Sequence, residues 1–204
     1  MNSTSLVGPV RQSIARFERR PLPSYLTREQ VRQLIAACLS ERDQLLVHLA
    51  WETGGRISEL LGVTRRDLDL KNRQVRLRTL KKPKDRRRRP VEQFRWIPIH
   101  DGLAADFGDY LTRAPAGDRL FPISRVRAFE IVREAAERAG LEVAGGRHIS
   151  PHILRHSFAV NCLNQGVPIN IVKELLGHAS ILTTMVYLRV VPADLRVFLS
   201  RVEF

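Results

Sequence analysis

The stretch Ser150-Pro-His-Ile-Leu-Arg-His-Ser-Phe-Ala-Val-Asn-Cys-Leu-Asn-Gln165 begins with a helix start signal and carries ionisable side chains in its first two turns. Ser150 is a favourable N-cap and Pro151 suits the first helical position, so the sequence predicts a helix from there to about Gln165, ended by Gly166. His152 and Arg155 are three positions apart and therefore share one face of this helix. Because the N-terminal end of a helix is positive, that face fits a phosphate group.

The same helix offers two alternatives to a phosphate site. His152 and His156, four positions apart, could in principle bind a metal ion. The inverted zinc-protease pattern needs a glutamate before the second histidine, but Arg155 stands there, and a guanidinium repels a cation. We therefore expect no metal. The remaining alternative is purely structural: a capping helix whose histidines are buried and hydrogen-bonded.

Two shorter motifs lie on either side of this helix in the sequence. Downstream, Leu175-Leu-Gly-His178 places a histidine just after a helix stop, and Tyr187 follows nine residues later. Upstream, Thr53-Gly-Gly-Arg56-Ile-Ser-Glu-Leu60 places an arginine directly after a glycine turn. Taken singly, such a tyrosine is usually a core or rim residue, and such an arginine a surface residue.

Taken together and in this order, the motifs resemble the tyrosine recombinase (phage integrase) family. They are Thr-Gly-x-Arg-x-x-Glu-Leu, His-x-x-Arg-His, Leu-Gly-His and a tyrosine nine residues on, and the resemblance covers about residues 26–190. It implies a mainly α-helical fold with a small antiparallel β-sheet, the fold of the family's catalytic domain. The catalytic residues that it implies are Arg56, Lys81, His152, Arg155, His178 and the nucleophile Tyr187.

The lysine is placed by Leu80-Lys81-Lys82-Pro83, which lies where the family has its hairpin lysine. We prefer Lys81 over Lys82, and a solvated loop charge is the alternative for either. In the implied chemistry, Lys81 is the acid that protonates the leaving hydroxyl. His152, whose ordinary pKa is near ~6.5, is the general base for Tyr187.

Hydrophobic periodicity predicts the elements around these motifs. A capping box at Thr27–Gln30 starts one helix, and a helix over 41–53 with apolar side chains nearly all round is expected to be central. Residues 74–80 and 95–99 alternate as two strands of a hairpin. Further helices are expected at about 101–113, 124–139, 168–176, near Ser180 and near Pro192. We expect residues 1–25 to be a basic lead-in and residues 26–204 to form the catalytic domain.

Positive charge is concentrated in one part of the chain. The formal net charge is +13, and residues 65–95 hold 14 basic but only four acidic side chains. Such a concentration suits a polyanion, because each neutralised phosphate releases counterions; a solvated charged loop is the plain alternative. The predicted DNA-binding residues are those of the long basic loop: Lys82, Lys84, Arg86, Arg87, Arg88 and Arg89.

The resemblance implies a site-specific recombinase that cleaves and rejoins double-stranded DNA through a covalent 3′-phosphotyrosine, with no metal and no other cofactor. Two alternatives keep the same fold: a catalytically silent DNA-binding regulator, and an enzyme with type IB topoisomerase-like activity. Many family members carry a separate N-terminal helical domain, whereas the layout here is similar to the single-domain fimbrial-switch invertases. The family also implies a tetramer on paired DNA sites, and we expect a monomer in free solution.

Several classes are excluded by the sequence. No run of about 18 apolar residues exists, so no membrane span is expected, and the N-terminus lacks the apolar core of a signal peptide. Cys38 and Cys162 are the only cysteines. They cannot build a disulfide framework or a cysteine zinc site, so we expect a cytoplasmic protein.

Overall fold

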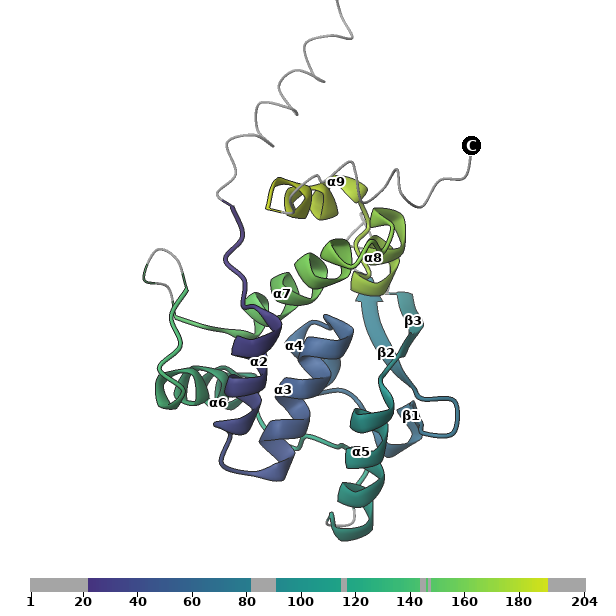
Figure 1. Cartoon of the computed structure of the whole chain (residues 1–204). Coiled ribbons are helices and arrows are strands. Elements are labelled where there is room, and N and C mark those ends of the chain that lie inside the picture. The colour runs from purple at the N-terminus through teal and green to yellow at the C-terminus, as the bar shows by residue number, and fades with distance from the viewer. Residues whose placement is uncertain (1–21, 82–90, 115–116, 144–145, 147, 191–204) are drawn as a thin grey trace, which may run out of the picture.

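The computed structural model describes residues 22–81, 91–114, 117–143, 146 and 148–190. Helices dominate it, and a small sheet lies along one side (Figure 1). The elements are α2 (Arg28–Ala36), α3 (Glu41–Thr53), α4 (Ile57–Leu60), η1 (Arg65–Asp67), β1 (Leu68–Asp69), β2 (Gln74–Lys81), β3 (Val91–Pro98), α5 (Asp101–Arg113), α6 (Arg125–Arg138), α7 (Pro151–Asn164), α8 (Ile169–Leu176), α9 (Ile181–Thr184) and η2 (Met185–Arg189). The mainly α-helical fold with a small antiparallel sheet, predicted from the sequence, is confirmed.

Helix α3 is the centre of the main core, as its apolar composition predicts. Ser40 caps its N-terminus by accepting a hydrogen bond from the backbone N–H of Asp43 at 3.2 Å. The helix packs against α2, α5 and α7. Leu46 and Leu49 are among the side chains that it buries almost completely. A helix that is apolar nearly all round is stable only when other elements cover it on several sides.

The sheet is antiparallel, in the order β1-β2-β3. Val75 pairs with Ile97 and Leu77 with Arg95, so these residues share the face that points into the protein. The hairpin predicted from the alternating pattern is confirmed. Strand β3 begins at Val91, four residues before the predicted start, because its ladder with β2 continues to the pair Lys81–Val91. Strand β1 was not predicted, since two residues are too few for a period to show.

Helix α7 links two hydrophobic cores. Leu154, near its beginning, belongs to the main core. Phe158 and Leu163, further along, belong to a second cluster with Leu176 of α8 and Tyr187 of η2. Both α8 and η2 pack against α7, and α8 lies at its far end (Figure 1). The motif-bearing half of α7 lies between the two cores.

Within the described ranges no single helix is long and apolar enough to cross a membrane; α8 and Ile181–Arg189 reach that length and composition only as a pair bent by 99°. The basic loop 82–90, the helix expected near Pro192 and most of the predicted lead-in fall outside the described residues.

Gly54 gives a test of the packing between α3 and α7. It caps α3 in the left-handed conformation with φ of 57°, and a Cβ there would clash with the Phe158 ring. Gly54→Ala should lower the free energy of unfolding by at least about 1–2 kcal/mol, from the backbone conformation alone. Urea unfolding measures this, with Gly102→Ala as the control, because nothing lies near a Cβ at Gly102. Equal stability of the two variants would contradict the packing described.

Candidate active site

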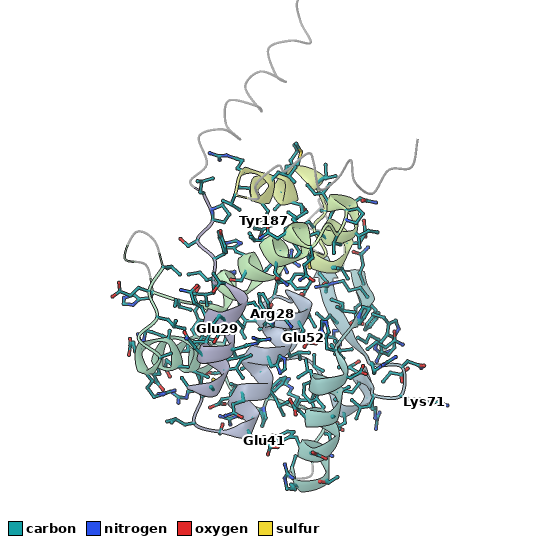
Figure 2. The ribbon with its side chains drawn as sticks, viewed as in Figure 1. Arg28, Glu29, Glu41, Glu52, Lys71 and Tyr187 are labelled. Carbon is teal, nitrogen blue, oxygen red and sulfur yellow. The ribbon has the colours of Figure 1, made fainter. Side chains whose placement is uncertain are left out.

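Four of the predicted residues come from four different elements and meet around the C-terminal end of α8. Arg155 lies in α7, Arg56 is the N-cap residue of α4, His178 follows α8, and Tyr187 lies in η2. Tyr187 is enclosed between the C-terminal helices and α7 (Figure 2). The sequence separates Arg56 from Gly177 by 121 residues, yet the two are hydrogen-bonded.

Arg155 is buried and anchored to backbone at both guanidinium nitrogens. Its Nη1 donates to the carbonyl of Gly54 at 2.7 Å, and its Nη2 donates to the carbonyl of Leu176 at 2.7 Å. Burial, followed by the nearby positive charge of Arg56, lowers its pKa to about 10. The side chain therefore stays charged at neutral pH while it bridges α3 and α8.

Arg56 is held by Glu59 one helical turn away. Its backbone N–H donates to Glu59 Oε2 at 2.9 Å and its Nη1 to Glu59 Oε1 at 3.1 Å, while Nη2 reaches the carbonyl of Gly177 at 3.4 Å. The Arg56 side chain is 38% exposed, whereas that of Glu59 is only 4% exposed. Glu59 thus fixes Arg56 on its buried side, and the exposed side of the Arg56 guanidinium can contact a ligand.

His178 sits directly after α8 and contacts Thr184 of α9. Its Nδ1 lies 2.9 Å from Thr184 Oγ1, and Thr184 is fully buried. Burial, followed by the charges of Arg155 and Arg56, lowers the pKa of His178 to about 4, so the ring is neutral at pH 7. If Thr184 donates to Nδ1, the ring proton is on Nε2, which makes His178 a neutral hydrogen-bond donor.

Tyr187 is 2% exposed, and its hydroxyl lies 2.8 Å from Nδ1 of His156. Burial raises its pKa above the ordinary value, although the charge of Arg155 acts in the opposite direction. Burial, followed by the charges of His152 and Arg155, lowers the pKa of His156 to about 4. A neutral phenol and a neutral imidazole are therefore hydrogen-bonded to each other.

His152 lies on the exposed side of α7, with its ring edge against Phe129 at a centroid distance of 6.0 Å. Burial lowers its pKa, and Arg125, Arg155 and Arg56 contribute in the same direction. It thus shares the electrostatic environment of the two arginines. The hydrogen bond described for the Tyr187 hydroxyl goes to His156, so the role of His152 as general base stays a prediction.

Charge at the site is unbalanced toward positive. Arg56 and Arg155 each lower the pKa of His152 and of His178, and among described residues Glu59 is the acidic group that contacts Arg56. No cluster of histidine, cysteine or acidic side chains among the described residues could hold a metal ion. Positively charged side chains that present exposed hydrogen-bond donors are suited to binding an oxyanion.

Four residues at the site were not predicted to have a role there: Glu59, Arg95, His156 and Thr184. Glu59 and His156 do stand in the quoted motifs, so a signal was present. His156 is one turn from His152, which places both on the same side of α7. Arg95 shows no local signal, because its partners Glu59 and Leu175 are distant in sequence.

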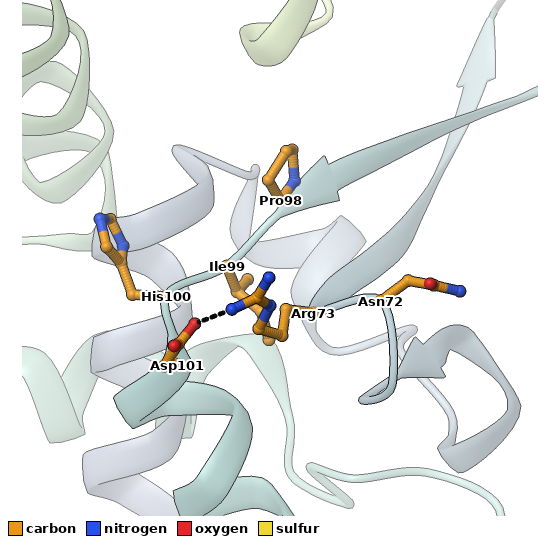
Figure 3. Close-up of a pocket in the computed structure, with 6 residues that line it drawn as sticks. All are labelled: Asn72, Arg73, Pro98, Ile99, His100 and Asp101. Atoms are coloured by element: carbon orange, nitrogen blue, oxygen red, sulfur yellow. Dashed lines mark hydrogen bonds and ion pairs between the residues drawn. The ribbon is translucent and has the colours of Figure 1, made fainter.

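Lys81 is the last residue of β2, opposite Val91, at the end of the hairpin where the basic loop begins. Its side chain and the loop residues Lys82, Lys84, Arg86, Arg87, Arg88 and Arg89 lie outside the described part of the structure. A shallow pocket lies at the opposite end of the hairpin, where the ion pair between Arg73 and Asp101 spans 2.7 Å (Figure 3). None of the predicted site residues lines it.

A helical domain with two arginines and a histidine gathered beside a buried tyrosine defines a class of protein, and the comparisons with known proteins identify it. The model of the phage integrase family matches residues 24–193, and the chain belongs to this family. The tyrosine recombinase XerA of Pyrococcus furiosus is 34% identical over an alignment of 194 residues, and the match covers 89% of this chain and 63% of that protein. The chain spans about three fifths of the length of the curated relatives it matches.

Solved structures share the fold. The catalytic domain of bacteriophage HP1 integrase is 27% identical with a TM-score of 0.63, and the match covers 88% of this chain and 95% of that domain. The XerH site-specific recombinase, in a post-cleavage complex with its palindromic difH substrate, is 23% identical with a TM-score of 0.67. That match covers 89% of this chain and 54% of XerH. The tyrosine recombinase catalytic-domain fold inferred from the motifs is confirmed.

The buried carboxylate of Glu59 predicts an acid-sensitive step in stability. Burial alone would raise its pKa, but hydrogen bonds and charge from Arg95, together with Thr79 and the Arg56 backbone, lower it to about 2. A carboxyl group with a depressed folded-state pKa stabilises above its unfolded pKa and loses this contribution as pH falls toward the folded value.

Between pH 5 and pH 3 the wild type should therefore lose about 2 kcal/mol of unfolding free energy that Glu59→Gln does not lose. Urea unfolding at a series of pH values measures the difference. Glu130→Gln is the control, because Glu130 forms an exposed ion pair with Arg127. Parallel pH profiles for wild type and Glu59→Gln would contradict the assignment.

Proposed function

We propose that the protein is a site-specific DNA recombinase that cleaves and rejoins strands of double-stranded DNA through a covalent 3′-phosphotyrosine at Tyr187, with residues 26–204 as its catalytic domain. The observation that carries this is the convergence of Arg56, Arg155 and His178 around the end of α8, beside a buried tyrosine. Membership of the phage integrase family supports the same reading. DNA as substrate places the activity in the cytoplasm.

The proposed chemistry uses the positive charge of the site. Attack of the Tyr187 oxygen on a phosphodiester forms a phosphorus–oxygen bond, breaks the bond to the 5′-oxygen and places extra negative charge on the non-bridging oxygens. The guanidiniums of Arg56 and Arg155 stabilise that charge with forked donors, and neutral His178 adds a further donor. These groups are already in place before DNA binds, so little reorganisation is needed.

Two proton transfers complete the step. The Tyr187 proton must leave as the phosphorus bond forms, because a phenol with a pKa near ~10 or above is a poor nucleophile at pH 7. We assign this proton to His152, and Tyr187 must then exchange its hydrogen bond with His156 for the substrate. Lys81 gives a proton to the departing 5′-oxygen, and attack by a 5′-hydroxyl on the phosphotyrosine reverses the reaction. The bond energy is conserved, so neither a metal nor a nucleotide is called for.

The basic segment 65–95 supports double-stranded DNA as the partner. We assign phosphate contacts to Lys82, Lys84, Arg86, Arg87, Arg88 and Arg89. From the family resemblance we propose a tetramer on two paired DNA sites and a monomer in free solution. Light scattering with and without DNA distinguishes these states.

Tyr187→Phe tests the nucleophile. The variant should bind duplex DNA as the wild type does but form no covalent adduct, because phenylalanine has no oxygen to attack phosphorus. The measurement uses a nicked duplex that traps the cleaved strand, read on a denaturing gel. Tyr110→Phe is the matched control and should keep the adduct. A persistent adduct with Tyr187→Phe would exclude this residue, and DNA binding without any wild-type adduct would favour the silent regulator.

Arg56→Ala and Arg155→Ala test the charge-stabilising roles. Each should slow strand cleavage by ~10²-fold or more, because one donor to the developing charge is lost. DNA binding should change far less. Single-turnover cleavage and a binding titration on the same duplex separate the two effects. Cleavage within about threefold of wild type by either variant would show that its assigned role is wrong. Arg→Lys should not restore the rate, since an ammonium cannot make the forked pair.

A further inference from the structure

Three successive backbone carbonyls at the C-terminal end of α8 each accept a hydrogen bond from a different arginine. Arg95 Nε donates to the carbonyl of Leu175 at 2.9 Å, Arg155 Nη2 to that of Leu176 at 2.7 Å, and Arg56 Nη2 to that of Gly177 at 3.4 Å. The last carbonyls of a helix have no partner inside the helix and carry its negative partial charge, so cations are favoured there. Two of these arginines belong to the proposed catalytic set, and Arg95 does not.

Arg95 also binds the carboxylate that holds Arg56. Its Nη2 donates to Glu59 Oε2 at 2.7 Å, and its Nη1 donates to Glu59 Oε1 at 3.2 Å and to Thr79 Oγ1 at 2.7 Å. Thr79 in turn donates its hydroxyl proton to Glu59. The Arg95 side chain is 16% exposed, against 38% for Arg56. Two arginines therefore share one buried carboxylate, and Arg95 is the one turned away from solvent.

The backbone after α8 is built closely around the Arg95 guanidinium. Gly177 ends α8 in the left-handed conformation with φ of 64°, and a Cβ at this position would lie 3.0 Å from Arg95 Nη1. Glycine meets both demands at once, because it adopts positive φ without strain and has no Cβ. The turn that carries His178 thus rests directly on Arg95.

We propose that Arg95 is a positioning residue for Arg56. It holds the Glu59 carboxylate with two forked bonds, is itself fixed by Leu175, and so fixes the acceptor on which the Arg56 guanidinium rests. This role rests on the proposed function, in which Arg56 contacts the scissile phosphate. Without Arg95, Glu59 keeps Arg56 as its charged partner among the described residues. Arg56 is then drawn toward the carboxylate and away from the oxyanion.

A double-mutant cycle tests this, because a residue that acts through Arg56 has no effect once Arg56 is removed. Arg95→Gln should slow single-turnover cleavage of a nicked trapping duplex by ~10-fold or more, since small misplacements of a charge-stabilising group are costly. DNA affinity should stay within about threefold, since phosphate contacts elsewhere are kept. In the Arg56→Ala background, Arg95→Gln should change cleavage by less than about twofold. Arg113→Gln, which removes an exposed ion pair with Glu41, is the control and should leave cleavage unchanged.

Binding of orthovanadate, followed by tryptophan fluorescence, repeats the cycle without DNA chemistry. The oxyanion should bind more weakly to Arg95→Gln than to wild type, and equally to Arg56→Ala with and without Arg95→Gln. If the effects of Arg95→Gln and Arg56→Ala on vanadate binding are coupled but the wild-type protein forms no DNA adduct, the proposed function is overturned and the positioning role is supported. Additive effects in both cycles would overturn the positioning role alone. If every variant binds vanadate as the wild type does, the positioning role is overturned as well.

The variant Arg95→Lys tests the same role if Arg95→Gln fails to fold. The ammonium keeps the charge beside Glu59 but cannot reach Glu59, Thr79 and Leu175 with a fixed fork. It should therefore retain the wild-type melting temperature within a few degrees and still slow cleavage, with the same dependence on Arg56. Wild-type cleavage by a folded Arg95→Lys protein would overturn the proposal.

Discussion

The carbonyl end of α8 is the feature on which the arrangement of the site depends. Its last peptide groups accept from guanidiniums of β3, α7 and the start of α4, so a sheet, a core helix and a short helix meet at one helix terminus. Each donor satisfies a carbonyl that would otherwise be unpaired, and each carbonyl orients a charge that would otherwise be mobile. The arrangement of the three arginines therefore depends on the position of α8.

Bringing several positive charges together costs free energy, and the electrostatics of the site explains why they are nevertheless gathered there. Burial and repulsion by Arg56 lower the pKa of Arg155, so the charge that it keeps at neutral pH is unfavourable until an anion arrives. Glu59 offsets part of the charge from beneath, on the side away from solvent. In the proposed function, a phosphodiester that enters from the open side balances this charge, and the extra negative charge of the transition state is matched better than that of the ground state. Tyr187 meanwhile stays protonated against His156.

Local sequence patterns predicted the helices and strands. The features that these patterns did not predict depend on contacts between residues that are distant in the sequence. The capping box at Thr27, the apolar helix α3 and the alternating hairpin are all short-range signals, so their positions follow from the sequence. The motifs likewise indicated Arg56, Arg155, His178 and Tyr187 as one set. The partner of Tyr187 and the role of Arg95 depend on which segments meet in space, and neither helical nor strand periodicity carries that information. The short strand β1 depends on pairing with β2 alone.

The account is tested most directly by mapping the covalent link on the wild-type protein. The protein is incubated with a nicked trapping duplex, digested with nuclease and trypsin, and analysed by tandem mass spectrometry. Cleavage after Lys173 and Arg189 releases residues 174–189, whose single tyrosine is Tyr187. The account predicts a residual nucleotide 3′-phosphate on that tyrosine. A nucleotide on Tyr25, Tyr110 or any other residue, or no covalent link at all on DNA that the protein binds, would contradict it.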